Sequence, residues 1–404
     1  MKKPFILIML FLICISFSGC WDYQSIAELN IISGIAVDTS DSNNYLLTFE
    51  IVNVSNGPEG IAKSIYADAE GSTLFETVRN AKKKLANKFY LGNMQLLVIS
   101  EKIAQTQGIL SILDALLRDG EPRETVSVVI SREKTAQAIL KEEGLDITNV
   151  AYELHNIIED DEKTTTATKN VQLFHAYNAL NEPGMTLVLP TIQFADNGQD
   201  ESSDESEKDK SEEEGSEKKS SEDKKIIELS GIAFLPKDRL AGYLSAAETH
   251  YFLTATNNIV GGAFSLSLKP DEPNDISMEI KRSVTKPEFS YQNDRLKIKL
   301  TIKNKMNLIE LREPLDVLDK NSREELINRC QDELKAHVTA IIKKAQEEFK
   351  TDIFSYGNRL YKNNPRLWEQ VKDDWSNTFC NAEIEVLVQT DLVNTGIILG
   401  GNAD

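Results

Sequence analysis

The sequence predicts an α+β protein of several domains. Strands and helices alternate along the first half, strands dominate the stretch after residue 225, and one long amphipathic helix occupies residues 322–350. The chain has 404 residues, of which 41% are apolar and 27% charged, an ordinary globular composition. At about 100–200 residues per domain, this length gives room for two to four domains.

In the first half, runs rich in β-branched residues and bounded by turn residues predict strands at 31–38, 45–54, 96–100, 125–131 and 185–194. Apolar residues at spacings of three and four predict helices at 74–85, 103–117, 136–140, 150–158 and 171–180. Ser72 and Thr73 ahead of Glu76 form a capping pattern for the first helix. Gly108 weakens the prediction of the helix at 103–117. Pro190 predicts that the strand at 185–194 lies at the edge of a sheet.

In the second half, antiparallel strands are predicted at 226–235, 240–244, 263–268, 276–286 and 295–302, with a short helix at 246–257. The long helix 322–350 is charged on one face and should lie across a sheet with the other. Its apolar stripe comprises Leu326, Cys330, Leu334, Val338, Ile341, Ala345 and Phe349. The last two predicted elements are a helix at 365–378, which begins at Pro365, and a strand at 383–390.

Residues 201–225 stand apart, because they contain no apolar side chain, 11 acidic residues and 6 basic ones. A segment with nothing to bury cannot offset its ordering entropy, so we expect a disordered acidic linker. It splits the chain into two parts.

The N-terminus has the pattern of a signal peptide. Lys2 and Lys3 are followed by an apolar run from Phe5 to Phe17, which is too short to span a bilayer comfortably. The run ends at Ser18-Gly19-Cys20. Small residues before a cysteine are typical of a lipobox, in which the cysteine thiolate receives a diacylglyceryl group and cleavage occurs before it.

This pattern favours a lipoprotein signal peptide, residues 1–19, over a plain secretory signal or an uncleaved anchor. Phe17 departs from the leucine that usually stands three residues before the cysteine. Two acyl chains anchor a protein stably where one is marginal. Trp21 and Asp22 follow the lipidation site, and an amphipathic Trp ring is favoured at the headgroup level. We therefore expect them to contact the membrane or a partner.

Composition excludes several classes of partner. The chain carries 64 acidic and 45 basic residues, a net charge of -19. Such a balance repels phosphate backbones, so we expect no nucleic-acid partner.

The cysteine content argues against a disulfide scaffold. If residues 1–19 are removed and Cys20 is lipidated, two cysteines remain in the exported protein, Cys330 and Cys380, which are too few for such a scaffold. We favour the interpretation that both are buried thiols that act as small apolar side chains. A disulfide bridge between them is the alternative.

No catalytic constellation is present. The sequence lacks the zinc-protease, nucleophile-elbow, phosphate-loop and calcium-loop motifs, and its four histidines have no metal-ligand spacing. Glu248 and His250 are too close on one helix to converge on a substrate, and Asp373-Asp374 is expected to be a solvated helix face. The sequence therefore predicts neither an enzyme nor a cofactor or metal site.

Four short motifs in order resemble the Ger(x)C family, the lipoprotein C subunits of nutrient germinant receptors of endospore-forming bacteria. The lipobox leads into Cys20-Trp21-Asp22 and a Gly34-Ile35 strand ending at Asp38. Later blocks are Leu229-Ser230-Gly231-Ile232-Ala233-Phe234, Asp238-Arg239-Leu240-Ala241-Gly242-Tyr243-Leu244, Glu248-Thr249, Asp352-Ile353-Phe354-Ser355-Tyr356-Gly357, Pro365, Trp368, Trp375 and Phe379. For the glycines and the last three aromatic residues, packing is favoured over partner binding.

The resemblance implies a three-domain protein on the outer face of the spore's inner membrane, assembled with integral membrane A and B subunits to sense nutrients. On this basis we expect domains at 20–200, 226–275 and 276–404, the first and second separated by the linker. Whether this subunit touches the nutrient stays open.

Two other classes compete with a non-catalytic receptor subunit. A solute-binding lipoprotein of an envelope transporter needs two α/β lobes around a ligand pocket, which the antiparallel second half argues against. An envelope hydrolase needs a constellation that the sequence lacks.

Overall fold

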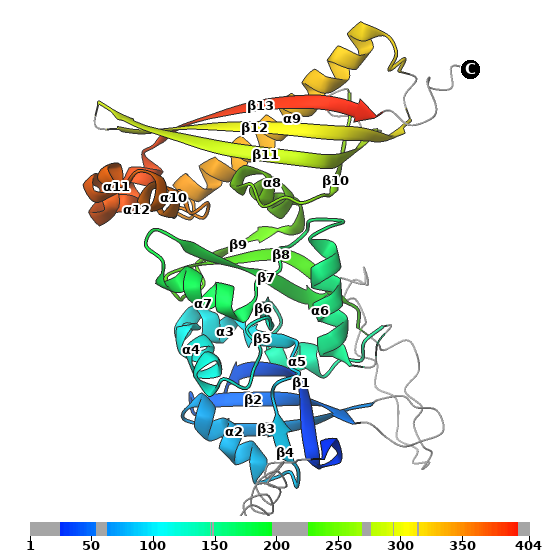
Figure 1. Cartoon of the computed structure of the whole chain (residues 1–404), viewed down its shortest axis with the longest axis vertical. Helices are drawn as coiled ribbons and strands as arrows, with labels where there is room; N and C mark the ends of the chain where they lie inside the picture. The colour runs from blue at the N-terminus through cyan, green and yellow to red at the C-terminus, as the bar shows by residue number, and fades with distance from the viewer. Residues whose placement is uncertain are drawn as a thin grey trace, which may run out of the picture.

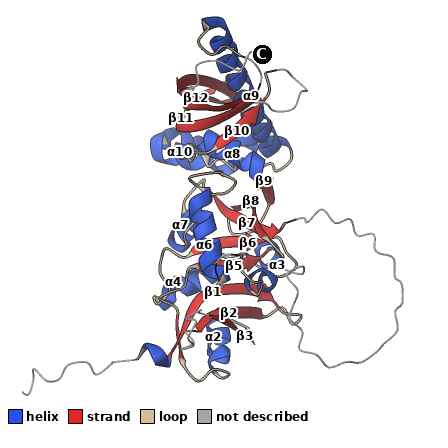
Figure 2. Cartoon of the chain, turned by 90° about the vertical axis from the view of Figure 1, so that its right-hand side faces the viewer, coloured by secondary structure: helices blue, strands red, loops and turns tan. Residues whose placement is uncertain are grey.

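The computed structural model of the chain describes residues 25–53, 63–145, 147, 149–195, 225–268, 276–293, 295–312 and 315–394. In these residues the strands form two sheets that follow one another along the long axis of the molecule (Figures 1 and 2). Helices pack against both sheets, so the predicted α+β class with mixed sheets is confirmed. Most of the linker predicted at 201–225 and all of the signal peptide predicted at 1–19 lie outside the described residues.

The larger sheet runs in the order β3-β2-β1-β5-β6-β7-β8-β9, with β4 beside β1. Its centre, β1-β5-β6-β7, is parallel, and both ends are antiparallel. The strands are β1 (Leu29–Thr39), β2 (Tyr45–Asn53), β3 (Lys63–Gly71), β4 (Lys88–Tyr90), β5 (Leu96–Ser100), β6 (Ser127–Ser131), β7 (Thr186–Phe194), β8 (Ile227–Pro236) and β9 (Gly242–Ser245).

Helices cover both faces of this sheet, which explains why β5 and β6 are buried along their whole lengths. One face carries α2 (Leu74–Lys82), α3 (Glu101–Thr106), α4 (Leu110–Asp119) and α7 (Leu173–Asn181). The other carries α5 (Ala136–Leu140) and α6 (Val150–Asp161). A short 3-10 helix, η1 (Ile26–Glu28), precedes β1.

Two predictions for the first half are wrong. The helix predicted at 103–117 is two helices, α3 and α4, because Gly108 has a φ of +84° that no helix accommodates. Pro190 does not mark a sheet edge: β7 lies between β6 and β8, and its ladder to β6 is confined to Thr191 and Ile192.

Two strands of the larger sheet were missed. Strand β3 has no clear apolar alternation, since its inward positions include the small side chains of Ala67 and Ala69. Strand β4 has three residues, which is too short for a period of two to be recognised.

The smaller sheet has the order β10-β11-β12-β13. Its strands are β10 (Ala263–Leu266), β11 (Ile276–Gln292), β12 (Arg295–Leu311) and β13 (Glu383–Asn394). The long helix α9 (Lys320–Glu347) crosses one face, as Figure 1 shows. The predicted stripe from Leu326 to Ala345 is buried against this sheet, in one core with Ile298, Leu300 and Ile302 of β12.

The strand predicted at 383–390 is β13, and it runs parallel to β12, whereas β10, β11 and β12 are antiparallel as predicted. Parallel neighbours need a long crossover. Here it consists of α9, α10 (Tyr356–Asn363), α11 (Pro365–Val371), η2 (Lys372–Asp374) and α12 (Trp375–Cys380). The single helix predicted at 365–378 is therefore broken into α11, η2 and α12.

The strands predicted for 226–275 are shared between the two sheets: β8 and β9 extend the larger one, and β10 joins the smaller one. Helix α8 (Ala246–Thr256) connects them and begins with a capping box between Ser245 and Glu248. The division of the chain into three domains stays a prediction.

The turn between α9 and α10 is built around the buried carboxyl of Asp352. It accepts hydrogen bonds from the backbone N–H groups of Phe354 (3.1 Å) and Gly357 (2.9 Å) and from Nε1 of Trp375 (3.2 Å). Burial outweighs these donors and raises the pKa of Asp352 to about 6.

The same turn contacts the larger sheet through the loop before β7. The Thr186 hydroxyl donates to the carbonyl oxygen of Asp352 (2.8 Å), and the Asn358 backbone N–H donates to the carbonyl oxygen of Gly184 (2.9 Å). The Glu182 carboxylate accepts from Nδ2 of Asn358 (3.0 Å) and pairs with Lys362 (2.8 Å). We call residues 182–186 together with 352–362 the junction, because they connect the two sheets.

Two motif glycines lie where the backbone approaches a neighbour closely. Gly231 in β8 has a φ of +124°, and a Cβ built there would lie 2.1 Å from the carbonyl oxygen of Leu244 on β9. A Cβ on Gly34 would lie 2.7 Å from Cβ of Ala151 on α6. The packing interpretation of these two glycines is confirmed.

We expect Gly231→Ala to reduce the free energy of unfolding by about 3 kcal/mol or more, because it adds backbone strain to a clash with a backbone oxygen. Gly120→Ala is the matched control: Gly120 also has a positive φ, +71°, but its Cβ position is open. That change should cost about 1 kcal/mol. Urea unfolding measures both, and equal losses would contradict the role of the clash.

Asp352→Asn should flatten the pH dependence of stability. Since the folded-state pKa is raised from 3.8 to about 6, protonation of Asp352 favours the folded state. That stabilisation is fully present below pH 3.8 and is lost as the pH rises through about 6. Between pH 3.8 and pH values above about 6, the free energy of unfolding of the natural chain should therefore fall by roughly 2–3 kcal/mol relative to that of the variant. Parallel pH profiles in urea unfolding would refute the assignment.

Candidate functional sites

The three site residues predicted from the sequence, Cys20, Trp21 and Asp22, lie outside the described residues. The first described residue is Ser25, shortly before β1, which lies between β2 and β5 in the larger sheet. Within the described part of the chain, no helix is both long enough and apolar enough to cross a membrane.

The motif residue Asp38 positions a helix. From the end of β1 its carboxylate accepts hydrogen bonds from the backbone N–H groups of Ala136 (2.8 Å) and Gln137 (2.9 Å), at the start of α5. Glu50 of β2 does the same for α6, accepting from Val150 (2.9 Å) and Ala151 (3.0 Å). Both side chains satisfy free donors at a helix N-terminus, and burial raises the pKa of both carboxyls.

Glu248 and His250 do not form an acid–base pair. The Glu248 carboxylate pairs with Lys344 of α9 (2.6 Å), whereas Nδ1 of His250 lies 2.7 Å from the hydroxyl of Thr166. Burial lowers the pKa of His250 to about 4. Among the residues that the structure describes, no group of His, Cys, Asp and Glu could hold a metal ion.

Cys330 and Cys380, the two cysteines among the described residues, are both free thiols. Cys330 is buried on the α9 stripe, and burial raises its pKa to about 12. Cys380 is half-buried at the end of α12. No bridge connects them, as the favoured prediction requires, but only Cys330 of the two predicted buried thiols is buried.

Trp368, Trp375 and Phe379 pack together although they do not share one helix. The ring centroids of the two tryptophans are 5.6 Å apart, and those of Trp375 and Phe379 are 6.4 Å apart. Phe354 and Tyr356 of the junction stack at 5.2 Å and reach Phe379. The core interpretation of these aromatic residues is therefore confirmed.

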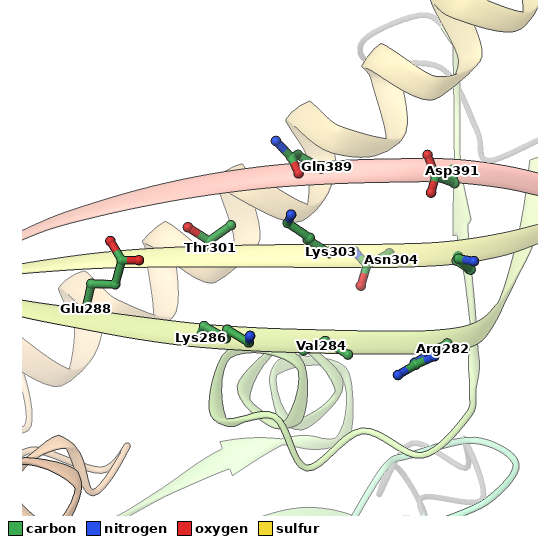
Figure 3. A pocket seen from close by; sticks show the side chains of 10 residues that line it. Arg282, Val284, Lys286, Glu288, Thr301, Lys303, Asn304, Gln389 and Asp391 are labelled. Carbon is green, nitrogen blue, oxygen red and sulfur yellow. The ribbon is translucent and has the colours of Figure 1, made fainter. Parts of the chain in front are cut away.

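The face of the smaller sheet opposite α9 carries a groove of about 520 Å³ (Figure 3). Arg282 lies across from Lys305, Val284 from Lys303 and Lys286 from Thr301, so these side chains share one face of β11 and β12. Gln389 and Asp391 of β13 complete the row. We call this the basic groove.

Five basic side chains on this face have no carboxylate within 4.0 Å among the described residues: Arg282, Lys286, Lys299, Lys303 and Lys305. Arg282 and Lys305 lie directly across the strand pair, where like charges repel one another. Lys299 instead lies across from Glu288 and Glu385, and Asp391 lies across from Lys305 on the other side. An anionic group in the basic groove would relieve that repulsion, so this surface is suited to an acidic partner. In the sequence, the basic face corresponds to the alternation of Lys and apolar residues at 295–305. This alternation predicts a strand but does not show which side chains lie across from it.

Comparison with known proteins covers nearly the whole described chain. Residues 22–194 match the family model "Spore germination protein N-terminal domain", and residues 230–396 match "Spore germination B3/ GerAC like, C-terminal". Spore germination protein KC of Bacillus subtilis (strain 168) is 24% identical, over 98% of this chain and 97% of its own. Spore germination protein B3 of the same organism is 22% identical, over 96% and 97%.

The fold is also shared with a solved structure. The crystal structure of the GerBC protein aligns with 89% of this chain and 97% of its own at a TM-score of 0.56, with 18% sequence identity. These matches confirm the family that the sequence resembles, and the solved structure agrees with the predicted α+β class. Both halves of the chain, and therefore the chain as a whole, belong to the Ger(x)C family of spore germination proteins.

Proposed function

We propose that this chain is the lipid-anchored C subunit of a nutrient germinant receptor. The observation that carries the proposal is the match of both halves to spore germination families, with relatives aligned from end to end. In this proposal the subunit assembles with integral membrane A and B subunits on the outer face of the spore's inner membrane. It positions partners and performs no chemical step.

Cys20 supplies the anchor in this proposal, through a diacylglyceryl group on its thiolate. Trp21 and Asp22 then lie next to the lipid, with the Trp ring at the headgroup level. Tethering in the membrane plane raises the effective concentration of the subunit for its partners without a large interface.

The alternative, a solute-binding lipoprotein of a transporter, has less support. Such proteins need two similar α/β lobes, whereas here a large sheet covered on both faces is followed by a smaller sheet with an open basic face. Co-purification from detergent extracts separates the two classes, since the receptor proposal requires A and B subunits to be recovered with the chain.

Cys20→Ala should release the protein from the membrane and abolish the nutrient response of spores, while non-nutrient triggers still work. Membrane fractionation and a germination assay measure the two effects. Cys380→Ala is the matched control, because it removes another exported thiol and should change neither. Release from the membrane with normal germination would refute the receptor proposal and favour the solute-binding alternative.

We further propose that the basic groove receives an acidic surface of a membrane subunit. The chain carries a net charge of -19, yet this face concentrates five basic side chains without a carboxylate partner among the described residues. Complementary charge steers association and fixes the register of docking more than it adds affinity.

Reversing two charges, Lys303→Glu with Lys305→Glu, should reduce recovery of the A and B subunits about tenfold and leave the thermal midpoint of the chain unchanged. Both side chains are exposed and form no ion pair within the described residues. The control pair is Lys82→Glu with Lys83→Glu on α2, which makes the same change in net charge elsewhere. Equal losses with both pairs would rule out a specific role for the groove.

A further inference from the structure

A second hollow lies at the junction, between the two halves that the family models match. It consists of two adjoining parts, of about 330 and 180 Å³, that share Lys169, Met185, Thr186 and Val188. Helix α7 and strand β7 supply one wall, and the end of α8 and the start of α10 supply the other. Contacts between domains are a common location for small-molecule sites.

Two basic side chains line the smaller part, one from each half of the chain. Nζ of Lys169 donates to Oδ1 of Asn258 at 3.3 Å, and Nη2 of Arg359 donates to the carbonyl oxygen of Thr256 at 2.6 Å. A lysine has three donors and a guanidinium has five. Most of their hydrogen-bonding capacity is therefore left for a ligand.

Neither cation has a carboxylate within 4.0 Å among the described residues. Burial lowers the pKa of Lys169, and the charge of Glu162, which forms no ion pair with it, raises this pKa by a smaller amount. The acid that lines the larger part, Glu182, is already bound by Lys362 (2.8 Å) and by Asn358 (3.0 Å). Lys169 and Arg359 are both partly buried. A partly dehydrated cation without a close counterion is less stable than a fully hydrated one, and an anion in the hollow would offset that loss.

The remaining walls define the rest of the ligand. Val188, Phe252, Ile353 and Phe354 present apolar surface beside the two cations, and Thr256 and Ser355 contribute hydroxyl groups. The smaller part has the size of roughly six water molecules in the liquid. This combination fits a compact anion with a short aliphatic chain better than it fits an inorganic ion or a polyanion.

We infer that the junction hollow binds a small aliphatic carboxylate, whose oxygens are held by Lys169 and Arg359. The ligand would connect a residue of the first half to a residue of the second and so stabilise their contact. This inference rests on the geometry of the hollow and does not depend on the role of the chain as a receptor subunit.

The test is a calorimetric titration of the full chain in detergent with isovalerate. Its uncharged analogue isoamyl alcohol and inorganic phosphate are titrated in parallel. Saturable binding of isovalerate, with no binding of the alcohol and weaker binding of phosphate, is expected. No binding of isovalerate, or tighter binding of phosphate, would overturn the inference.

Lys169→Met should weaken isovalerate binding at least about tenfold, and Lys335→Met is the matched control. Lys335 is exposed on α9 and lines neither part of the hollow, so its removal should leave the affinity within about twofold. Replacement of an unpaired cation in a poorly hydrated site by an apolar side chain is neutral or stabilising. The unliganded Lys169→Met chain should therefore melt at the same temperature or higher.

A purely structural role gives the opposite result. If Lys169 only holds the end of α8 through Asn258, Lys169→Met lowers the melting temperature and leaves isovalerate binding unchanged. That outcome would overturn the inference. Loss of germination in the Cys20→Ala spores has no bearing on this titration, so the two proposals fail separately.

Discussion

The buried carboxyl of Asp352 is the constraint on which the relation between the two sheets depends. It fixes the turn between α9 and α10 by accepting from two backbone N–H groups and an indole. The turn then presents the Asp352 carbonyl oxygen and the Asn358 backbone N–H to Thr186 and Gly184 of the larger sheet. Val188, Phe234 and Leu244 of the larger sheet pack in one core with the smaller sheet and α9. Because buried polar groups must be paired, the hydrogen bonds of the junction fix the orientation in which the two sheets meet.

Charge is distributed unevenly in a chain that is acidic overall. Asp38 and Glu50 are inside, where each faces the N-terminus of a helix, and basic side chains gather on the outer face of β11 and β12. The interior carboxylates hold α5 and α6 on the sheet, whereas the exterior cations can meet other molecules. Net charge alone would have suggested a uniformly acidic surface, but local fields decide which partner can approach.

The comparison with GerBC shows how much of this architecture survives sequence divergence. At 18% identity the two chains still align over 89% of this one. Within this chain, Gly231 and Asp38 have geometric roles: Gly231 lies at a close backbone approach, and Asp38 accepts hydrogen bonds at the start of a helix. The proposed anchor at Cys20 lies at one end of the chain, and the basic groove is formed by strands near the other. A single polypeptide can thus be tethered through one end and present a docking surface on the other half.

The class of fold, most element boundaries and the α9 stripe could be predicted from local sequence patterns, because period and capping are local properties. The family could be predicted from short motifs in order. The sequence also predicted the Cys20 lipobox, which the described residues do not test. Tertiary structure decided what local pattern does not encode. The parallel placement of β13, the interior position of Pro190 and the break at Gly108 depend on neighbours distant in sequence or on backbone angles. The groove and the junction hollow also form only when folding brings distant segments together. Lys305 then lies across from Arg282, and Lys169 and Arg359 line the same hollow.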